Sequence, residues 1–201
     1  MWGCDVLIAI EPTIEELSMN IIEHTEKYLG KIAKGWKGSG FEDDLQVVFF
    51  QNSPFDNVNT FLTLGLSHHV LSISNSKKVR QELVLPVSGV KQSSLIVTIL
   101  FYISELILKY HKSLLRGQVI SLPLELSMEC GYDAIYCAMP VFLNDTFSTF
   151  YESEPPTVMV WIIPIYQSES DFIAANGWER FEDLLEENDS DLFSCGRVAV
   201  I

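Results

Sequence analysis

The segment 157–188 decides the fold class, because TVMVWIIPIYQSESDFIAANGWERFEDLLEEN changes from a strand pattern to a helix pattern. Residues 157–163 are mostly β-branched or aromatic, which is typical of a strand. Ser168 and Asp171 have the spacing of a helix cap, and Gly177 is a usual helix stop, so they predict one helix between them. A second helix is predicted over residues 178–188.

The large apolar residues of this segment are expected to anchor the core. Trp161 lies in the middle of the apolar strand. Phe181, Leu184 and Leu185 form one stripe along the second helix, and acidic residues cover the rest of it. We therefore predict that Trp161 and Phe181 are structural anchors.

The rest of the chain repeats the two patterns in separate blocks. Strands are predicted over residues 45–51, 59–66, 81–87 and 118–124. Residues 95–110 are too long an apolar run for a strand, and they predict a central helix. Thr13 and Glu16 have the spacing of a capping box, which predicts an earlier helix of about five turns that runs toward Ile32. This order predicts an α+β fold, with a mixed or largely antiparallel sheet packed with helices, in a single domain over residues 1–201.

Composition and charge limit the partners. With 201 residues, 48% of them hydrophobic, the chain can bury a substantial core. A formal net charge of −14 predicts repulsion from nucleic acid and from anionic membranes, and attraction to basic proteins. The first residues lack the basic start of a signal peptide, and the apolar run 95–108 is shorter than the ~18–20 residues that cross a bilayer. We expect a cytoplasmic protein without a nucleic-acid or membrane partner, and its oligomeric state stays open.

The sequence offers little support for catalysis or for a bound metal or cofactor. The histidines His68 and His69 are adjacent, and in an extended segment they would point to opposite faces. The glycine-rich residues 35–40 lack the Gly-Lys-Ser/Thr ending of a phosphate-binding loop. Four scattered cysteines, which suggest reduced thiols without a function, are Cys4, Cys130, Cys137 and Cys195. We therefore predict no catalytic residue, no metal site and no cofactor.

Acidic residues are concentrated near the C-terminus. Residues 169–191 hold nine acidic residues against Arg180 alone, whereas residues 77–116 hold seven basic residues against Glu82 and Glu105. An acidic helix is often only a solvated face, but clustered charge also steers a basic partner. The candidate partner-binding residues are the acidic residues of the last helix and of an earlier acidic run: Glu179, Glu182, Asp183, Glu186, Glu187, Glu42, Asp43 and Asp44.

Two blocks of sequence resemble the suppressor of fused-like domain family. The first is Thr63-Leu64-Gly65-Leu66-Ser67, followed by Arg80-Gln81-Glu82-Leu83-Val84-Leu85-Pro86. The second is the strand end WIIPIY at residues 161–166, then Glu169 and the helix that follows Gly177. Residues 116–120 are similar to the glycine-led middle strand of the family, with Gln118 where the family has histidine. The resemblance spans roughly residues 45–190.

The resemblance implies protein binding. Animal members of the family bind a peptide of a transcription factor as an added strand, and short bacterial members resemble immunity proteins encoded beside secreted toxins. The chain has the size of the short bacterial form. Our leading hypothesis is an immunity protein that occludes the active surface of a cognate toxin, such as a nuclease with a basic cleft. The alternatives are a regulatory adaptor that sequesters a peptide or transcription factor by strand addition, and an uncharacterised hydrolase that uses His68 or His69.

Overall fold

A computed structural model of the protein describes residues 20–38, 45–89 and 93–201. Its centre is one mixed sheet with the strand order β1-β2-β3-β5-β9-β7-β6. The strands on this path are β1 (Lys34–Lys37), β2 (Gln46–Phe50), β3 (Val58–Leu64), β5 (Lys78–Ser88), β9 (Thr157–Ile165), β7 (Ala134–Ala138) and β6 (Val119–Ser121). Two short strands, β4 (Leu71–Ser72) and β8 (Thr149–Phe150), pair with β5 and β9.

Only the β5–β9 pair of the described sheet is parallel, and the other neighbouring strands are antiparallel. The helices are α1 (Ile21–Leu29), α2 (Ser93–Tyr110), α3 (Leu124–Cys130), α4 (Asp145–Ser148), α5 (Gln167–Asn176) and α6 (Trp178–Glu187). One 3₁₀ turn, η1 (Leu66–His68), follows β3. The predicted α+β class and the predicted largely antiparallel sheet are confirmed.

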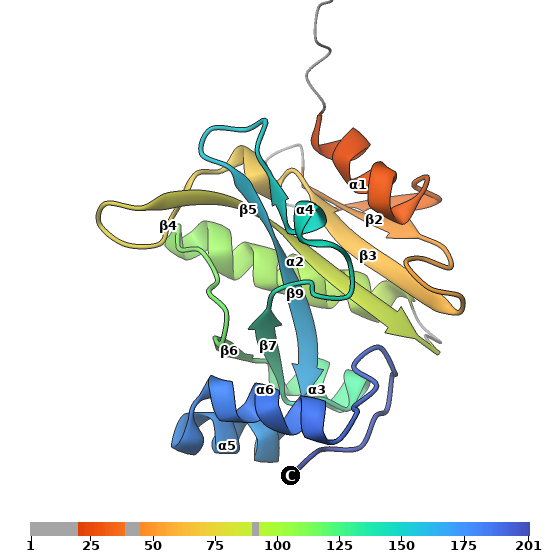
Figure 1. Ribbon diagram of the computed structural model, residues 1–201, viewed down its shortest axis with the longest axis vertical. Coiled ribbons are helices and arrows are strands. Elements are labelled where there is room, and N and C mark those ends of the chain that lie inside the picture. The colour runs from red at the N-terminus through yellow and green to blue at the C-terminus, as the bar shows by residue number, and fades with distance from the viewer. Residues whose placement is uncertain (1–19, 39–44, 90–92) are drawn as a thin grey trace, which may run out of the picture.

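Helices cover both faces of the sheet, which is why its central strands are apolar on both sides. Neighbouring residues of β3 point to opposite faces: Phe61 packs in the same core cluster as α2, and Leu62 packs in the cluster of α1, α5 and α6. Figure 1 shows α2 along one side of the sheet, whereas α5 and α6 lie together near the C-terminus at the lower end of the view. The C-terminal helices therefore meet the ends of β7 and β9.

Helix α2 confirms the predicted central helix. It is the one helix among the described residues that is long and apolar enough to cross a membrane by length and composition alone. In the fold its inner side packs against the sheet through residues that are at most 1% exposed, namely Ile99, Leu100, Ile103 and Ile107. The apolar residues on the inner side of α2 therefore form part of the core.

Several predicted boundaries differ from those of the structure. The described helix near the N-terminus begins at Ile21, because Asn20 has an extended backbone and caps it with Glu23; the Thr13–Glu16 pattern lies outside the described residues. The predicted strand 118–124 ends at Ser121, and Pro123 precedes α3, because proline cannot donate to a strand ladder. Helix α5 begins after Tyr166 rather than at Ser168. The carboxylate of Glu169 accepts the Tyr166 amide at 2.9 Å, so it fixes this start.

Candidate functional site

The Thr63–Ser67 motif is a turn that is held by one buried carboxylate. Glu82 is fully buried on β5 and accepts hydrogen bonds from the Gly65 and Ser67 amides at 3.0 and 2.9 Å and from the Thr63 hydroxyl at 2.6 Å. Burial raises the pKa of the Glu82 carboxyl to about 7, against these hydrogen bonds, which lower it. The Leu83 amide donates to the Thr63 oxygen at 2.8 Å, so the motif ties the end of β3 to β5.

The two residues before Glu82 fasten further loops. The guanidinium of Arg80 donates to the carbonyls of Ser67 and His68 at 2.7 and 2.9 Å. The amide side chain of Gln81 exchanges two hydrogen bonds with the backbone of Leu114, at 2.7 and 2.8 Å. The first block of the resemblance therefore holds the β3 end, the turn after it and the Leu114 loop to β5.

The His68–His69 pair lies in a turn, not in the extended segment that we predicted. Gly65 has a φ of 102°, a left-handed conformation that turns the chain out of β3, and η1 then ends at His68. Within residues 20–38, 45–89 and 93–201, no group of three or more His, Cys, Asp or Glu side chains could hold a metal ion.

Helix α6 packs on the sheet through the predicted apolar stripe. Phe181 is fully buried with its ring centroid 5.3 Å from that of Tyr136 on β7, and Leu185 is also buried. Leu184, the third predicted member, is only half-buried. Trp161 on β9 is 5% exposed. The prediction that Trp161 and Phe181 are anchors agrees with their burial.

One acidic residue of α6 joins the helix to a distant loop. Glu182 accepts a hydrogen bond from Arg116 Nε at 3.1 Å and one from the Tyr136 hydroxyl at 2.6 Å, and a second guanidinium N–H of Arg116 reaches its other oxygen. Burial, and then the Glu182 carboxylate, raise the pKa of Tyr136, so the phenol stays protonated and donates. Arg116 belongs to the basic segment 77–116, so the basic and acidic segments meet here.

Gly117 lets this loop approach α6 closely. Its φ is 87°, and a Cβ at this position would lie 2.4 Å from the ring of Trp178. The Arg116 guanidinium lies 4.7 Å from the centroid of the same ring. A side chain at Gly117 would therefore displace Trp178 and disturb the contact between Arg116 and α6.

A groove of about 410 Å³ opens beside this contact, between α6 and the strands β7 and β9. We call it the α6 groove. Its apolar lining includes Trp161, Ile163 and Leu185, together with the partly exposed Met139 and the strongly exposed Val141. Its polar lining comprises Arg116, Tyr136, Glu182, Glu186, Asp189 and Ser190.

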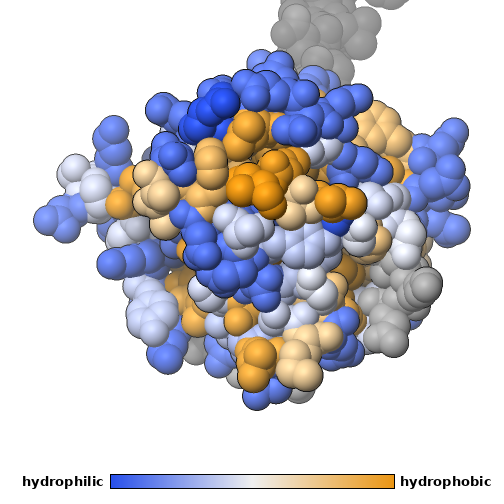
Figure 2. Space-filling model, turned by 90° about the horizontal axis from the view of Figure 1, so that it is seen from below, coloured by the Kyte–Doolittle hydropathy of each residue, from blue (hydrophilic) through white to orange (hydrophobic). Residues whose placement is uncertain are grey.

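The predicted partner-binding residues of α6 fall into two groups. Glu179, Asp183, Glu186 and Glu187 are exposed, and Glu186 lines the α6 groove. Glu182 is instead half-buried and held by Arg116 and Tyr136. The other predicted residues, Glu42, Asp43 and Asp44, lie outside the described residues. Viewed from the end where α5 and α6 lie, the surface mixes hydrophobic patches with hydrophilic residues (Figure 2).

A second cavity, of about 470 Å³, lies where β5 and β9 separate. The two strands pair from Arg80 and Thr157 to Val84 and Trp161; beyond this point β5 continues with β3, and β9 continues with β7. Figure 1 shows the two arrows diverging. Val87 of β5 and Pro164 of β9 both line the cavity.

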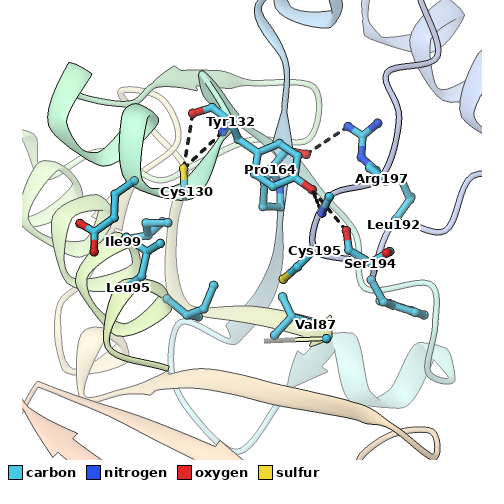
Figure 3. Close-up of a pocket in the computed structure, with 15 residues that line it drawn as sticks. Val87, Leu95, Ile99, Cys130, Tyr132, Pro164, Leu192, Ser194, Cys195 and Arg197 are labelled. Atoms are coloured by element: carbon cyan, nitrogen blue, oxygen red, sulfur yellow. Dashed lines mark hydrogen bonds between the residues drawn. The ribbon is translucent and has the colours of Figure 1, made fainter. Parts of the chain in front are cut away.

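Residues 192–197, which we call the C-terminal strap, close one side of this cavity. Ser88 donates its amide to the Phe193 carbonyl at 2.6 Å and accepts the Cys195 amide at 3.2 Å, so the strap pairs with the end of β5. The Tyr132 hydroxyl donates to the Ser194 carbonyl at 3.2 Å and accepts the Gly196 amide at 2.8 Å (Figure 3).

Arg197 anchors the end of the strap in a buried ion pair. Its guanidinium donates to the two oxygens of Glu169 at 2.7 and 2.6 Å and to the Pro164 carbonyl at 3.1 Å, and both side chains are at most 4% exposed. Sequence reasoning counted Glu169 with the acidic surface, but the structure places it inside. The partners are 28 positions apart in the sequence, so no local pattern reveals the pair.

Three free cysteines lie in or near the cavity and the sheet beside it. Cys130 and Cys195 line the cavity, and burial raises the pKa of each thiol; Cys137 is more deeply buried, and its pKa is raised to about 12. These three cysteines are free, and Cys4 lies outside the described residues.

The fold and its surface are those of a mixed α+β protein with grooves at the end where the C-terminal helices lie. The sequence model of the Suppressor of fused protein (SUFU) family matches residues 42–198, and the chain belongs to this family. No curated protein sequence matches the chain.

Solved structures of the family share the fold. A SUFU homolog from Neisseria gonorrhoeae has a TM-score of 0.70 at 14% identity, over 89% of this chain and 93% of its own. A chain of the Sufu–Fu complex has a TM-score of 0.67 at 12% identity, with 90% of each chain covered. Drosophila Suppressor of Fused has a TM-score of 0.68 at 12% identity, and the match covers 90% of this chain and 50% of that one.

Proposed function

We propose that this protein binds another protein through α6 and the α6 groove, and that the partner is a secreted toxin that it neutralises. The observation that carries this proposal is the combination of an exposed acidic helix with an apolar groove along its side. Interfaces commonly join an apolar centre to a charged rim. Membership of the SUFU family supports a protein partner, since a neighbour in fold was solved as the Sufu–Fu complex.

The exposed carboxylates would act on the encounter with a basic partner. Glu179, Glu186 and Glu187 are exposed, and they place part of the formal net charge of −14 on this face. Such a field raises the association rate of a basic protein, and salt weakens the effect. A nuclease is one suitable toxin, because its substrate cleft must be basic to hold phosphates.

The direct test uses the gene next to the one that encodes this chain. The C-terminal domain of a secreted protein encoded there is expressed in a bacterial host, alone and together with this chain. We expect growth arrest by that domain alone, and growth together with a stable complex when both are present. Growth arrest that this chain does not relieve, or relief without a complex, would contradict the proposal.

A charge-reversal variant tests the binding face. Replacement of Asp183, Glu186 and Glu187 by lysine should slow association with that toxin by ~10-fold or more at low salt. The matched control reverses Asp56, Glu105 and Glu152, which are also exposed but lie on other elements. Because the two variants have the same net charge, an equal loss of rate in both would refute a role for α6.

The separation of β5 and β9 favours strand addition as a second candidate function. Leu85 to Val87 pair with β3 on one side only, and the strap bonds to Ser88 at the end of the same stretch. Ser88 donates and accepts toward the strap, so the alternation of an antiparallel strand turns the backbone groups of Leu85 and Val87 toward β3 and leaves the Pro86 carbonyl facing the gap. An extended segment of a regulatory partner would donate to this carbonyl and replace the strap at Ser88. Hydrogen exchange of the complex separates the two candidates: a change confined to the Ser88 amide and the strap favours strand addition, whereas protection at Leu184–Glu187 favours α6.

A further inference from the structure

One wall of the α6 groove carries two carboxylates that the fold does not use. Glu186 and Asp189 both line the groove, and the Asp189 amide donates to the Glu186 carbonyl at 3.1 Å, so the two residues are one turn apart. In the described part of the chain neither has an ion-pair partner, whereas Glu182 is taken by Arg116 and Asp183 and Glu187 by Arg180. Two unpaired carboxylates on one wall favour a cationic occupant.

The floor of the groove is apolar, which excludes a small hydrated cation as the best occupant. Trp161, Ile163 and Leu185 form this floor, and Met139 and Val141 continue it at 39% and 77% exposure. A long basic side chain suits both features, because arginine and lysine bury an aliphatic stem against apolar surface and keep the charged head with polar groups.

Trp161 forms part of the groove lining, but its indole nitrogen is buried. The Nε1 of Trp161 is the one buried side-chain nitrogen or oxygen of the described residues without a hydrogen-bond partner. The rings of Phe142 and Phe193 pack on the indole, with centroids 5.0 and 5.8 Å away. Because this nitrogen has almost no exposed surface, an occupant of the groove can contact the Trp161 side chain but cannot accept from its N–H, so Trp161 is a reporter for the groove rather than a recognition group.

We infer that the α6 groove captures an arginine or lysine side chain of the partner. The head group pairs with Glu186 and Asp189, and the stem lies over Ile163 and Leu185. This inference rests on the proposed function for the nature of the partner, and it narrows the contact on the partner to one basic residue.

The test is an NMR titration of the full chain with acetyl-Gly-Arg-Gly-amide. The reporter is the indole N–H resonance of Trp161, which Trp161→Phe identifies by its loss. We expect this resonance to shift in a saturable way, and the indole signal of Trp36, on the distant strand β1, to stay in place. The same peptide with citrulline in place of arginine is neutral and of the same shape, and it should produce no shift.

The double variant Glu186→Gln and Asp189→Asn should weaken binding of the arginine peptide by ~10-fold or more. The pair Glu105→Gln and Glu152→Gln removes the same charge elsewhere on the surface and should leave the affinity unchanged. A Trp161 resonance that does not move, an equal response to citrulline, or an equal loss in both variants would overturn the inference. If the arginine peptide binds as expected and the chain still fails to relieve growth arrest, the proposed function fails and the basic-residue site stands.

Discussion

Replacement of Glu82 by glutamine should remove a pH dependence from the stability of the fold. The carboxyl is fully buried, and burial raises its pKa to about 7. The glutamine is neutral at every pH, and its amide oxygen still accepts the Gly65 and Ser67 amides that now bind one carboxylate oxygen. The variant therefore changes the charge of the site and keeps most of its hydrogen bonds.

The direction of the effect follows from the two states. A pKa raised in the folded protein means that the folded state holds its proton when the unfolded state has already lost it. The contribution of this proton to the stability of the folded state is therefore complete below the ordinary pKa of 4.5, and it is lost as the pH rises through about 7. At ~1.4 kcal/mol per pH unit, the loss is about 3 kcal/mol over this window.

Urea unfolding at about pH 5 and about pH 8 measures the difference, since both conditions lie above the isoelectric point of about 4.5. The free energy of unfolding of the wild type, minus that of Glu82→Gln, should fall by about 2–3 kcal/mol between the two conditions. The exposed residue Glu105 serves as a control, because Glu105→Gln should change this difference by less than about 0.5 kcal/mol. If the free energy of unfolding of the wild type minus that of Glu82→Gln is the same at both pH values, the Glu82 carboxyl does not titrate near neutrality and the reasoning is refuted.

Two further predictions concern the C-terminal elements, and both are measured by urea unfolding. Phe181→Ala should lower the free energy of unfolding by about 3–5 kcal/mol, because the ring is fully buried against Tyr136. An unchanged urea midpoint of unfolding would mean that α6 contributes nothing to the core. Arg197→Leu should lower the free energy of unfolding by about 3–5 kcal/mol, because it leaves the Glu169 carboxylate buried without its partner. Adding Glu169→Leu should recover part of this loss. A double variant as unstable as the single one would contradict the prediction.

The sequence predicted the elements that have a local signature. The apolar run around Ile99 predicts α2, the stripe around Phe181 predicts the buried side of α6, and Gly177 marks the end of α5. These features depend on residues within one or two turns of each other, so hydrophobic spacing is enough to find them. The same reasoning predicted one helix from Thr13 toward Ile32, whereas the extended Asn20 caps a helix that begins at Ile21.

The surface depends on contacts that no local pattern contains. Arg116 and Glu182 are separated by 66 residues, and Tyr136 and Glu182 by 46. Only the fold brings Gly117 against Trp178, so the glycine looked like a plain strand start in the sequence. The resemblance to the family did single out Glu82 and Glu169, but it could not tell that both carboxylates are internal and hold turns together.

The position of Glu182 changes how the acidic helix must be tested. A reversal that includes Glu182 would break its bonds to Arg116 and Tyr136, so slower association could result from a loosened α6 rather than from a weaker field. Glu186 carries the same charge one turn further along and makes no such contact within the described residues. Suppose that Glu186→Lys slows association with the partner at low salt and leaves the urea midpoint of unfolding unchanged. The negative field of α6 and the α6 groove are then responsible for the slower association. If only variants of Glu182 have an effect, the helix acts through its packing, and the charge around it serves solubility alone.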